Sequence, residues 1–97
     1  IKPMTVYAAP LRDMQFVLHD VLGISKYSNL PGFADATPDV IDAILEEGGK
    51  LAADVLHPIN QSGDHEGCAR AADGSVRTPK GFKEAYEQFR EGGWQGL

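Results

Sequence analysis

The sequence predicts a mostly α-helical fold, a small bundle of three main helices at about 10–22, 38–57 and 79–92. Apolar residues recur at the spacing of a helical face in each of these stretches. A proline stands at the expected first turn of each one, at Pro10, Pro38 and Pro79, where its missing N–H breaks no helical hydrogen bond. Breaker-rich segments separate the three stretches, so we expect three helices joined by loops.

The first helix is predicted over 10–22 and is expected to end at Gly23. Its predicted apolar face consists of Leu11, Met14, Val17, Leu18, Val21 and Leu22. An isolated helix of this length is marginal in water, so it needs another element to pack against. The following stretch, 25–36, is rich in turn residues and is predicted to be a loop, which Tyr27, Leu30 and Phe33 could anchor to the core.

The second helix is predicted over 38–57, with Thr37 before its first turn and Asp39 within it, where the helix dipole favours a negative charge. Gly48 and Gly49 each cost about 1 kcal/mol in a helix interior, but the apolar phase continues across them. We therefore expect one helix, in which Gly48 permits close approach by a neighbour. Pro58 is expected to end or kink it, before a polar stretch at 60–67.

A short hairpin is predicted near 69–77 around Asp73-Gly74, a dipeptide that supplies the positive φ angles of a tight turn. The alternative is an irregular loop with one turn, because neither arm has strong β composition. The third helix is predicted over 79–92 and ends at Gly92-Gly93. Its apolar residues, Phe82, Ala85, Tyr86 and Phe89, have helical spacing.

Composition argues against several function classes. The 97 residues suit one domain, 1–97, and a net charge of −5 opposes nucleic-acid binding. No apolar stretch approaches the ~20 residues that span a bilayer, so no membrane partner is expected. The chain opens without a signal-peptide pattern, and its single cysteine, Cys68, fits a reducing compartment as a packing or surface residue. We expect a cytoplasmic protein.

Candidate metal ligands are few. They are His57, Asp64, His65, Glu66 and Cys68. Structural zinc sites use paired short spacings that this set lacks, so we predict no metal ligand. Asp64-His65-Glu66 could hold a general base, but no nucleophile accompanies it, and a surface turn is the preferred interpretation. A metal-dependent hydrolase is the least favoured of the functions considered.

Other motifs are also interpreted as structural. The glycine-rich stretches 63–67 and 92–96 match no phosphate-binding pattern. The carboxylates of Glu46, Glu47, Glu84, Glu87 and Glu91 suggest exposed helix faces. The aromatic residues Phe82, Tyr86, Phe89 and Trp94 are expected in the core rather than in an aromatic cage, with Trp94 at a domain boundary. We therefore predict no catalytic, cofactor-binding or metal-binding residue.

An ordered string of residues in the last third carries a family resemblance. Its members are Asn60, Gly63, Asp64, Gly67, Asp73, Gly74, Thr78, Pro79, Gly81, Phe82, Ala85, Tyr86, Gly92, Gly93, Trp94 and Leu97. The string resembles the N-terminal helical domain of the acyl-CoA dehydrogenases, particularly its long bacterial members. Those members also open with a segment like Tyr7-x-x-Pro10-Leu11-Arg12-Asp13-Met14-x-Phe16-Val17-Leu18.

The resemblance implies an FAD-dependent enzyme in which this domain packs against a β-domain and a C-terminal helical bundle. The family removes the α-proton of an acyl-CoA with a glutamate, passes the β-hydride to FAD, and donates electrons to electron-transfer flavoprotein. That glutamate would lie beyond Leu97, so no catalytic role falls on a residue here. We expect an N-terminal fragment, inactive alone, with an exposed apolar patch or self-association. The alternative is a stand-alone helical protein-interaction module.

Overall fold

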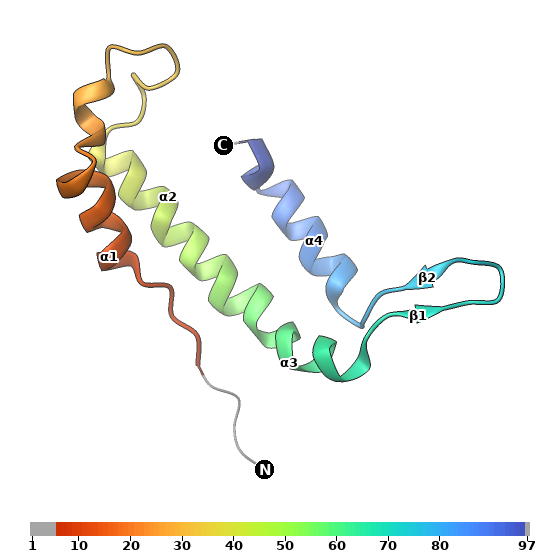
Figure 1. Cartoon of the computed structure of the whole chain (residues 1–97). Coiled ribbons are helices and arrows are strands. Elements are labelled where there is room, and N and C mark those ends of the chain that lie inside the picture. Colours follow the sequence, from red (N-terminus) through yellow and green to blue (C-terminus); the bar gives the residue numbers. More distant parts are fainter. Residues whose placement is uncertain (1–5, 97) are drawn as a thin grey trace. The chain divides into compact units, whose positions relative to one another are not determined.

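The computed structural model describes residues 6–96 and is mostly helical (Figure 1). Its α-helices are α1 (Leu11–Gln15), α2 (Pro38–Leu51), α3 (His57–Glu66) and α4 (Phe82–Glu91). Further helical turns are π-helical at Phe16–Val21 and Ala52–Leu56 and 3-10 at Ile24–Tyr27 and Trp94–Gly96. Strands β1 (Ala69–Arg70) and β2 (Val76–Arg77) pair antiparallel. The prediction of a mostly α fold with a small hairpin is confirmed. Residues 1–5 and Leu97, the last residue of the string that carries the family resemblance, lie outside the described range.

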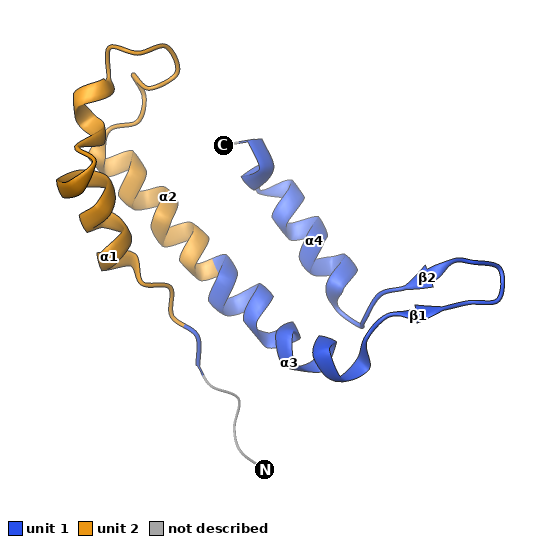
Figure 2. Cartoon of the chain, in the orientation of Figure 1, with its two compact units in different colours: residues 1–7, 51–97 blue, residues 8–50 orange. Residues whose placement is uncertain are grey.

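Backbone contacts divide the chain into two compact units (Figure 2). We call residues 8–50 the N-terminal unit, and residues 51–97 together with 1–7 the C-terminal unit. The first contains α1 and α2. The second contains α3, the hairpin and α4.

Within the N-terminal unit, α1 and the π-helical turn that follows it pack against α2. The less exposed side chains are those of Leu11, Gln15, Leu18 and His19. The predicted apolar face is therefore wrong in part, because Met14, Val17, Val21 and Leu22 are exposed. From Phe16 to Val21 the backbone is π-helical, and its wider turn shifts the phase of the side chains relative to an α-helix.

Two contacts hold α1 and the turn after it on α2. The Nε2 atom of His19 lies 2.7 Å from Oδ1 of Asp42, in a partly buried hydrogen bond. A Cβ atom at Gly49 would lie 3.3 Å from Cδ2 of Leu11 and 3.5 Å from Cβ of Ala9. The close approach that the structure shows is thus at Gly49, next to the predicted Gly48.

The start of α2 follows the prediction. The amide of Ile41 donates to the carbonyl of Thr37 at 2.9 Å, and the amide of Val40 lies 3.4 Å from the Thr37 hydroxyl. Pro38 occupies the first turn, where no partner for an N–H is needed. Ile41 is buried against the rest of the unit, with 9% of its surface exposed.

The helical backbone does not end at Pro58, so a helix end there is wrong, and the polar stretch after it is helical as far as Glu66. In a regular α-helix the proline ring would press on the carbonyl four residues earlier. Here the preceding turn is π-helical, and the amide of His57 reaches back to the carbonyl of Ala52. This wider turn accommodates the ring, and Pro58 lies in the first turn of α3.

The hairpin between α3 and α4 has the predicted turn. Ala69 pairs with Arg77 and Arg70 with Val76, and Gly74 has a φ of 90°. The carboxylate of Asp73 accepts hydrogen bonds from the hydroxyl of Ser75 at 2.7 Å and from its amide at 3.0 Å. These bonds fix the turn even though both strands are short.

The helix α4 begins at Phe82 rather than at the predicted Pro79. Gly81 has a φ of 91°, a left-handed conformation that cannot lie inside an α-helix. The amide of Ala85 donates to the carbonyl of Gly81 at 3.0 Å, so Gly81 is the residue from which the helix starts. Thr78 and Pro79 therefore lie in the connection before α4.

The described residues have a very small hydrophobic core. Only Ile41 and Ala85 are buried hydrophobic residues among residues 6–96, while fifteen large hydrophobic side chains are exposed. Tyr27, Leu30 and Phe33 belong to the exposed set, so the prediction that they anchor the loop after the first helix is wrong. The expected exposed apolar surface is confirmed. Of the helices that residues 6–96 form, none is long and apolar enough to cross a membrane.

Candidate functional site

An apolar groove in the C-terminal unit is the main candidate site. It has a volume of about 320 Å³ and lies between α4 and the helical residues around the start of α3. Its lining residues are Leu56, Ile59, Asn60, Phe82, Ala85, Tyr86 and Phe89. Asn60 contributes an amide and Tyr86 a phenol hydroxyl, and the other five lining residues are apolar.

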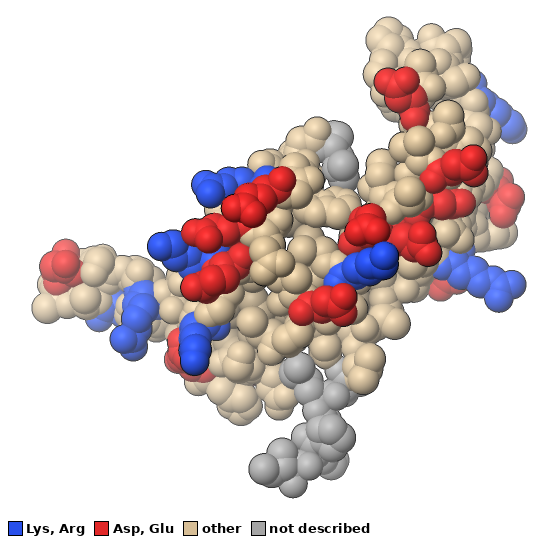
Figure 3. Space-filling view, turned by 180° about the vertical axis from the view of Figure 1, so that it is seen from behind, with Lys and Arg blue, Asp and Glu red and all other residues tan. Residues whose placement is uncertain are grey.

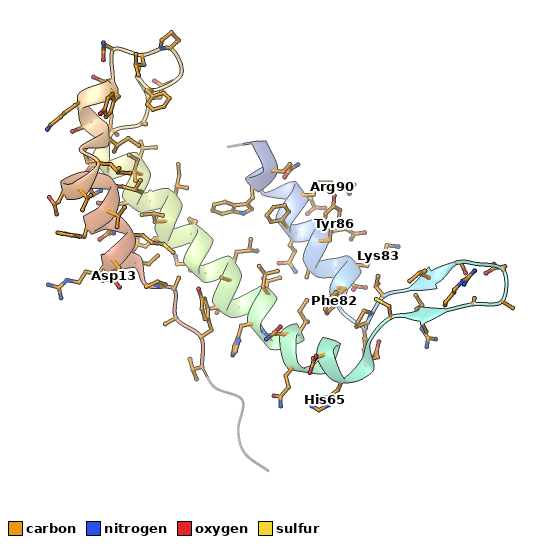
Figure 4. The ribbon with its side chains drawn as sticks, viewed as in Figure 1. Asp13, His65, Phe82, Lys83, Tyr86 and Arg90 are labelled. Atoms are coloured by element: carbon orange, nitrogen blue, oxygen red, sulfur yellow. The ribbon has the colours of Figure 1, made fainter. Side chains whose placement is uncertain are left out.

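At one end of the groove, the start of α4 is in direct contact with α3. The ring of Phe82 lies directly over Gly63, where a Cβ atom would be 2.5 Å from Cε1 and Cζ of the ring. Figure 4 shows Phe82 at the end of α4 that is nearest α3. A carboxylate oxygen of Glu66 accepts a hydrogen bond from the amide of Lys80 at 2.7 Å. Together these two contacts fix the position of the first turn of α4 relative to α3.

One side of α4 carries two basic residues. Lys83, Tyr86 and Arg90 are spaced so that they share one side of α4, and all three point away from the ribbon in Figure 4. Tyr86 is 62% exposed, and its ring lies beside that of Phe89 with centroids 6.5 Å apart. Within the part of the chain that the structure describes, neither Lys83 nor Arg90 forms an ion pair. This side of α4 therefore presents an exposed aromatic ring between two basic residues, with Glu87 beside them by helical spacing.

A second pocket adjoins the first. It has a volume of about 240 Å³ and is lined by Tyr7, Ala52, Leu56, His57 and Asn60. The rings of Tyr7 and His57 are 6.0 Å apart at an interplanar angle of 37°. The two pockets share Leu56 and Asn60, so these side chains separate them.

The N-terminal unit has a pocket of its own. Its volume is about 390 Å³, and it is lined by Asp13, Met14, Val17, Leu18 and Leu45. Four of these five side chains are apolar, and Asp13 supplies the one ionisable group. The pocket lacks the pair of ionisable groups that acid–base chemistry normally uses.

The candidate metal ligands are not brought together. Residues 6–96 contain no group of three or more His, Cys, Asp or Glu side chains that could hold a metal ion. The ring of His57 lies beside Tyr7, the carboxylate of Glu66 binds a backbone amide, and the thiol of Cys68 is free and exposed. Figure 4 places His65 on α3, on the side away from α4.

The other sequence motifs have structural positions. Glu47 forms an exposed ion pair with Lys50 at 3.2 Å, as expected of a helix face. Phe82 and Phe89 are partly buried in the groove, but Tyr86 is not a core residue, so that prediction is wrong for its ring. The indole of Trp94 folds over Gly92, where a Cβ atom would lie 2.8 Å from Nε1.

Sequence reasoning missed one wall of the groove. The sequence predicts a helix end or kink near Pro58 and a polar stretch from Asn60, whereas Ile59 and Asn60 lie within α3 and line the groove beside α4. The pattern Leu56, Ile59 and Gly63, spaced three and four residues apart, is the signal that could have shown the helix continuing through Pro58.

No Lys or Arg side chain lines any of the three pockets described above. That no residue of this chain binds the cofactor stays a prediction.

Comparison with known proteins identifies relatives along most of the chain. No protein-family model matches it. It is 36% identical over 91 residues, 94% of the chain, to 3-methylmercaptopropionyl-CoA dehydrogenase of Ruegeria pomeroyi. It is 33% identical over 90 residues, 90% of the chain, to butyryl-CoA dehydrogenase of Syntrophomonas wolfei subsp. wolfei. The chain spans about 15% of the length of each of these relatives. It therefore matches one domain of the acyl-CoA dehydrogenases and belongs to that family.

Proposed function

We propose that the chain is the N-terminal helical domain, as a single domain over 1–97, of an FAD-dependent acyl-CoA dehydrogenase, and that it is inactive alone. The observation that best supports this proposal is the exposed apolar surface of the helices. Among the described residues, only Ile41 and Ala85 are buried hydrophobic residues. Helices with such open apolar faces are stable when another domain covers them. The short coverage of both dehydrogenase relatives supports the presence of such a domain.

In the full-length enzyme the proposed reaction is α,β-dehydrogenation of an acyl-CoA thioester, with FAD as hydride acceptor and electron-transfer flavoprotein as the next electron carrier. The β-domain and the C-terminal bundle would bind FAD and supply the catalytic glutamate. The role proposed for this chain is to complete the fold and to form one wall of the substrate cavity. A cytoplasmic location is part of the proposal, and the free thiol of Cys68 is consistent with a reducing compartment.

A chimeric enzyme tests this proposal. The matching segment of the Ruegeria pomeroyi dehydrogenase is replaced by this chain, and flavin content and acyl-CoA-dependent dye reduction are measured. We expect a yellow enzyme with at least a tenth of the parent kcat/KM, because matched domains preserve the packing that positions the substrate. The matched control carries Phe82→Asp, which places a charge against Gly63 and is expected to lower flavin retention.

The chain alone gives the second part of the test. Mixed with FAD and passed through gel filtration, it is expected to retain no flavin and to reduce no dye with an acyl-CoA. Retained flavin or turnover would show that the chain is catalytically complete. A chimera that folds without flavin would instead favour the alternative, a stand-alone interaction module that uses the open groove between α3 and α4.

A further inference from the structure

The pocket of the N-terminal unit combines an apolar lining with one carboxylate. Met14, Val17, Leu18 and Leu45 supply the apolar lining, and Asp13 supplies the carboxylate. Leu18 and Leu45 are partly buried, whereas Met14 is 37% exposed and Val17 is 46% exposed. The lining comes from α1, the π-helical turn after it and α2, so this one unit builds the pocket.

The carboxylate of Asp13 has no basic partner in its own unit. In the described part of the molecule it forms no ion pair, and it is exposed. Arg12 is the next residue along α1, which places it about 100° around the helix axis from Asp13. Lys50 pairs with a glutamate of α2 at 3.2 Å, and the side chain of Lys26 lies over Gly23. Asp13 therefore lines the pocket as an unpaired charge.

The whole N-terminal unit is acidic. Residues 8–50 carry seven Asp and Glu against three Lys and Arg. Acidic side chains accordingly outnumber basic ones over this unit, on the right in Figure 3. The summed charge of such a surface attracts groups of the opposite sign. The pocket thus lies in a field that favours a cation.

Covering the pocket changes the environment of Asp13. The proposed function places another domain over the open apolar faces, and water then leaves the pocket. A carboxylate that loses water without gaining a partner is costly. A surface that covers Met14 and Val17 must therefore also bring a positive charge to Asp13. Arginine and lysine join a long apolar stem to a cationic head, so either one can cover the lining and pair with the carboxylate.

We propose that this pocket receives an arginine or lysine side chain of the domain that packs on the N-terminal unit. Its stem lies against the apolar lining and its head pairs with Asp13. This inference rests on the proposed function and deepens it, because it names the chemistry of the partner at one point of the contact. The pairing aligns the two domains, since charge complementarity fixes the register of an interface.

The sign of one substitution tests the proposal. Asp13→Leu is made in the full-length protein that carries this chain, and the thermal midpoint is measured by circular dichroism. If a basic side chain occupies the pocket, leucine leaves its charge unpaired, and the midpoint is expected to fall by about 3 °C or more. If the covering surface is only apolar, leucine removes an unpaired carboxylate, and the midpoint stays or rises. That second result would overturn the proposal.

Two controls isolate the pairing. Asp13 lies in the first turn of α1, where a negative charge stabilises a helix, so Asp13→Leu in the chain alone measures this smaller contribution. Asp20→Leu removes an exposed acid that does not line the pocket. Its midpoint in the full-length protein is expected to stay within about 1 °C of the parent. A fall for Asp13→Leu no larger than in these controls would contradict the pairing.

A small cation tests the pocket without the partner domain. n-Butylguanidinium reproduces the stem and head of an arginine side chain, and NMR shifts of the Val17 and Leu45 methyl groups report its binding to the chain. Asp13→Asn keeps the shape of the side chain but removes its charge, and is expected to weaken this binding about threefold. n-Butanol, the uncharged control, is expected to bind both proteins alike. Equal binding of n-butylguanidinium to both proteins would count against the proposal.

The two proposals fail in different ways. A full-length protein without flavin or acyl-CoA-dependent dye reduction contradicts the proposed function, and the midpoint and the n-butylguanidinium titration still decide what the pocket receives. An active, flavin-containing protein in which Asp13→Leu raises the midpoint keeps the proposed function and excludes the pairing.

Discussion

At the scale of single residues, Gly63 is the position with the least room for a side chain. Gly63→Ala places a Cβ atom 2.5 Å from two carbons of the Phe82 ring, so the ring must move. Overpacking of this kind costs about 1–3 kcal/mol, against a gain of up to about 1 kcal/mol in helix propensity. We expect a net loss of about 1 kcal/mol in the free energy of unfolding, measured by urea titration of circular dichroism.

Gly96→Ala is the matched control for Gly63→Ala. Gly96 has no heavy atom within 4 Å of an added Cβ and has no positive φ. Its free energy of unfolding is expected to stay within about 0.5 kcal/mol of the parent. An unchanged or more stable Gly63→Ala variant would contradict the contact between α3 and α4.

At the scale of elements, the hairpin is predicted to loosen in acid. The hydroxyl of Ser75, and then its amide, hold the pKa of Asp73 below its ordinary value of 3.8. A carboxyl whose pKa is lowered by folding stabilises the folded turn fully above the ordinary pKa, and this stabilisation is lost as pH falls through the lowered pKa. The amide shift and exchange protection of Ser75, followed by NMR, should therefore change below about pH 4.

Asp73→Asn is the control for the acid effect. The asparagine keeps an oxygen acceptor for the two Ser75 donors but does not titrate. The variant should keep the turn and lose its dependence on pH in this range. The same pH dependence in both proteins would show that another group is responsible.

The elements also show how far the sequence determines the fold. The start of α2 and the turn of the hairpin were predictable because short local motifs, Thr37-Pro38 and Asp73-Gly74, specify them. The continuation of the helix through Pro58 could not be predicted, because it depends on a π-helical turn before the proline that relieves the steric clash of its ring. The start of α4 at Phe82 likewise depends on the left-handed conformation of Gly81. The Thr78-Pro79 pattern instead suggested a helix start at Pro79.

The candidate site was less predictable than the fold. Phe82, Tyr86 and Phe89 were recognised as one helical face, so one wall of the groove was correct. The other wall could not be predicted without knowing that α3 continues through Pro58. Periodicity indicates which residues share a face, but the partner of that face depends on tertiary contacts.

At the scale of the whole molecule, the small core predicts weak cooperativity. A chain that buries only two hydrophobic residues among those described exposes less new surface on unfolding than a compact domain of the same length. The slope of its urea transition is therefore expected to fall below the 1–3 kcal/mol/M typical of small proteins, at about 1 kcal/mol/M or less. Urea titration followed by circular dichroism measures this slope.

The same surface should bind a hydrophobic dye. Anilinonaphthalene sulfonate fluorescence is expected to be high for the chain alone and lower when the chain is part of the chimeric dehydrogenase, compared per molecule. A steep urea transition together with negligible dye fluorescence would show that the helices are covered in the chain itself.

The hydrogen bond between Glu66 and the amide of Lys80 closes a loop in the chain. Residues 67–79 leave the end of α3 and return to the same place, and the turn at Asp73-Gly74 is their outer tip. Insertions or deletions at this tip are therefore expected to leave the position of α4 against α3 unchanged. Among relatives, the length of the polypeptide should vary here more freely than anywhere else between the two helices, and a fluorescent label or affinity tag placed here would not disturb the groove.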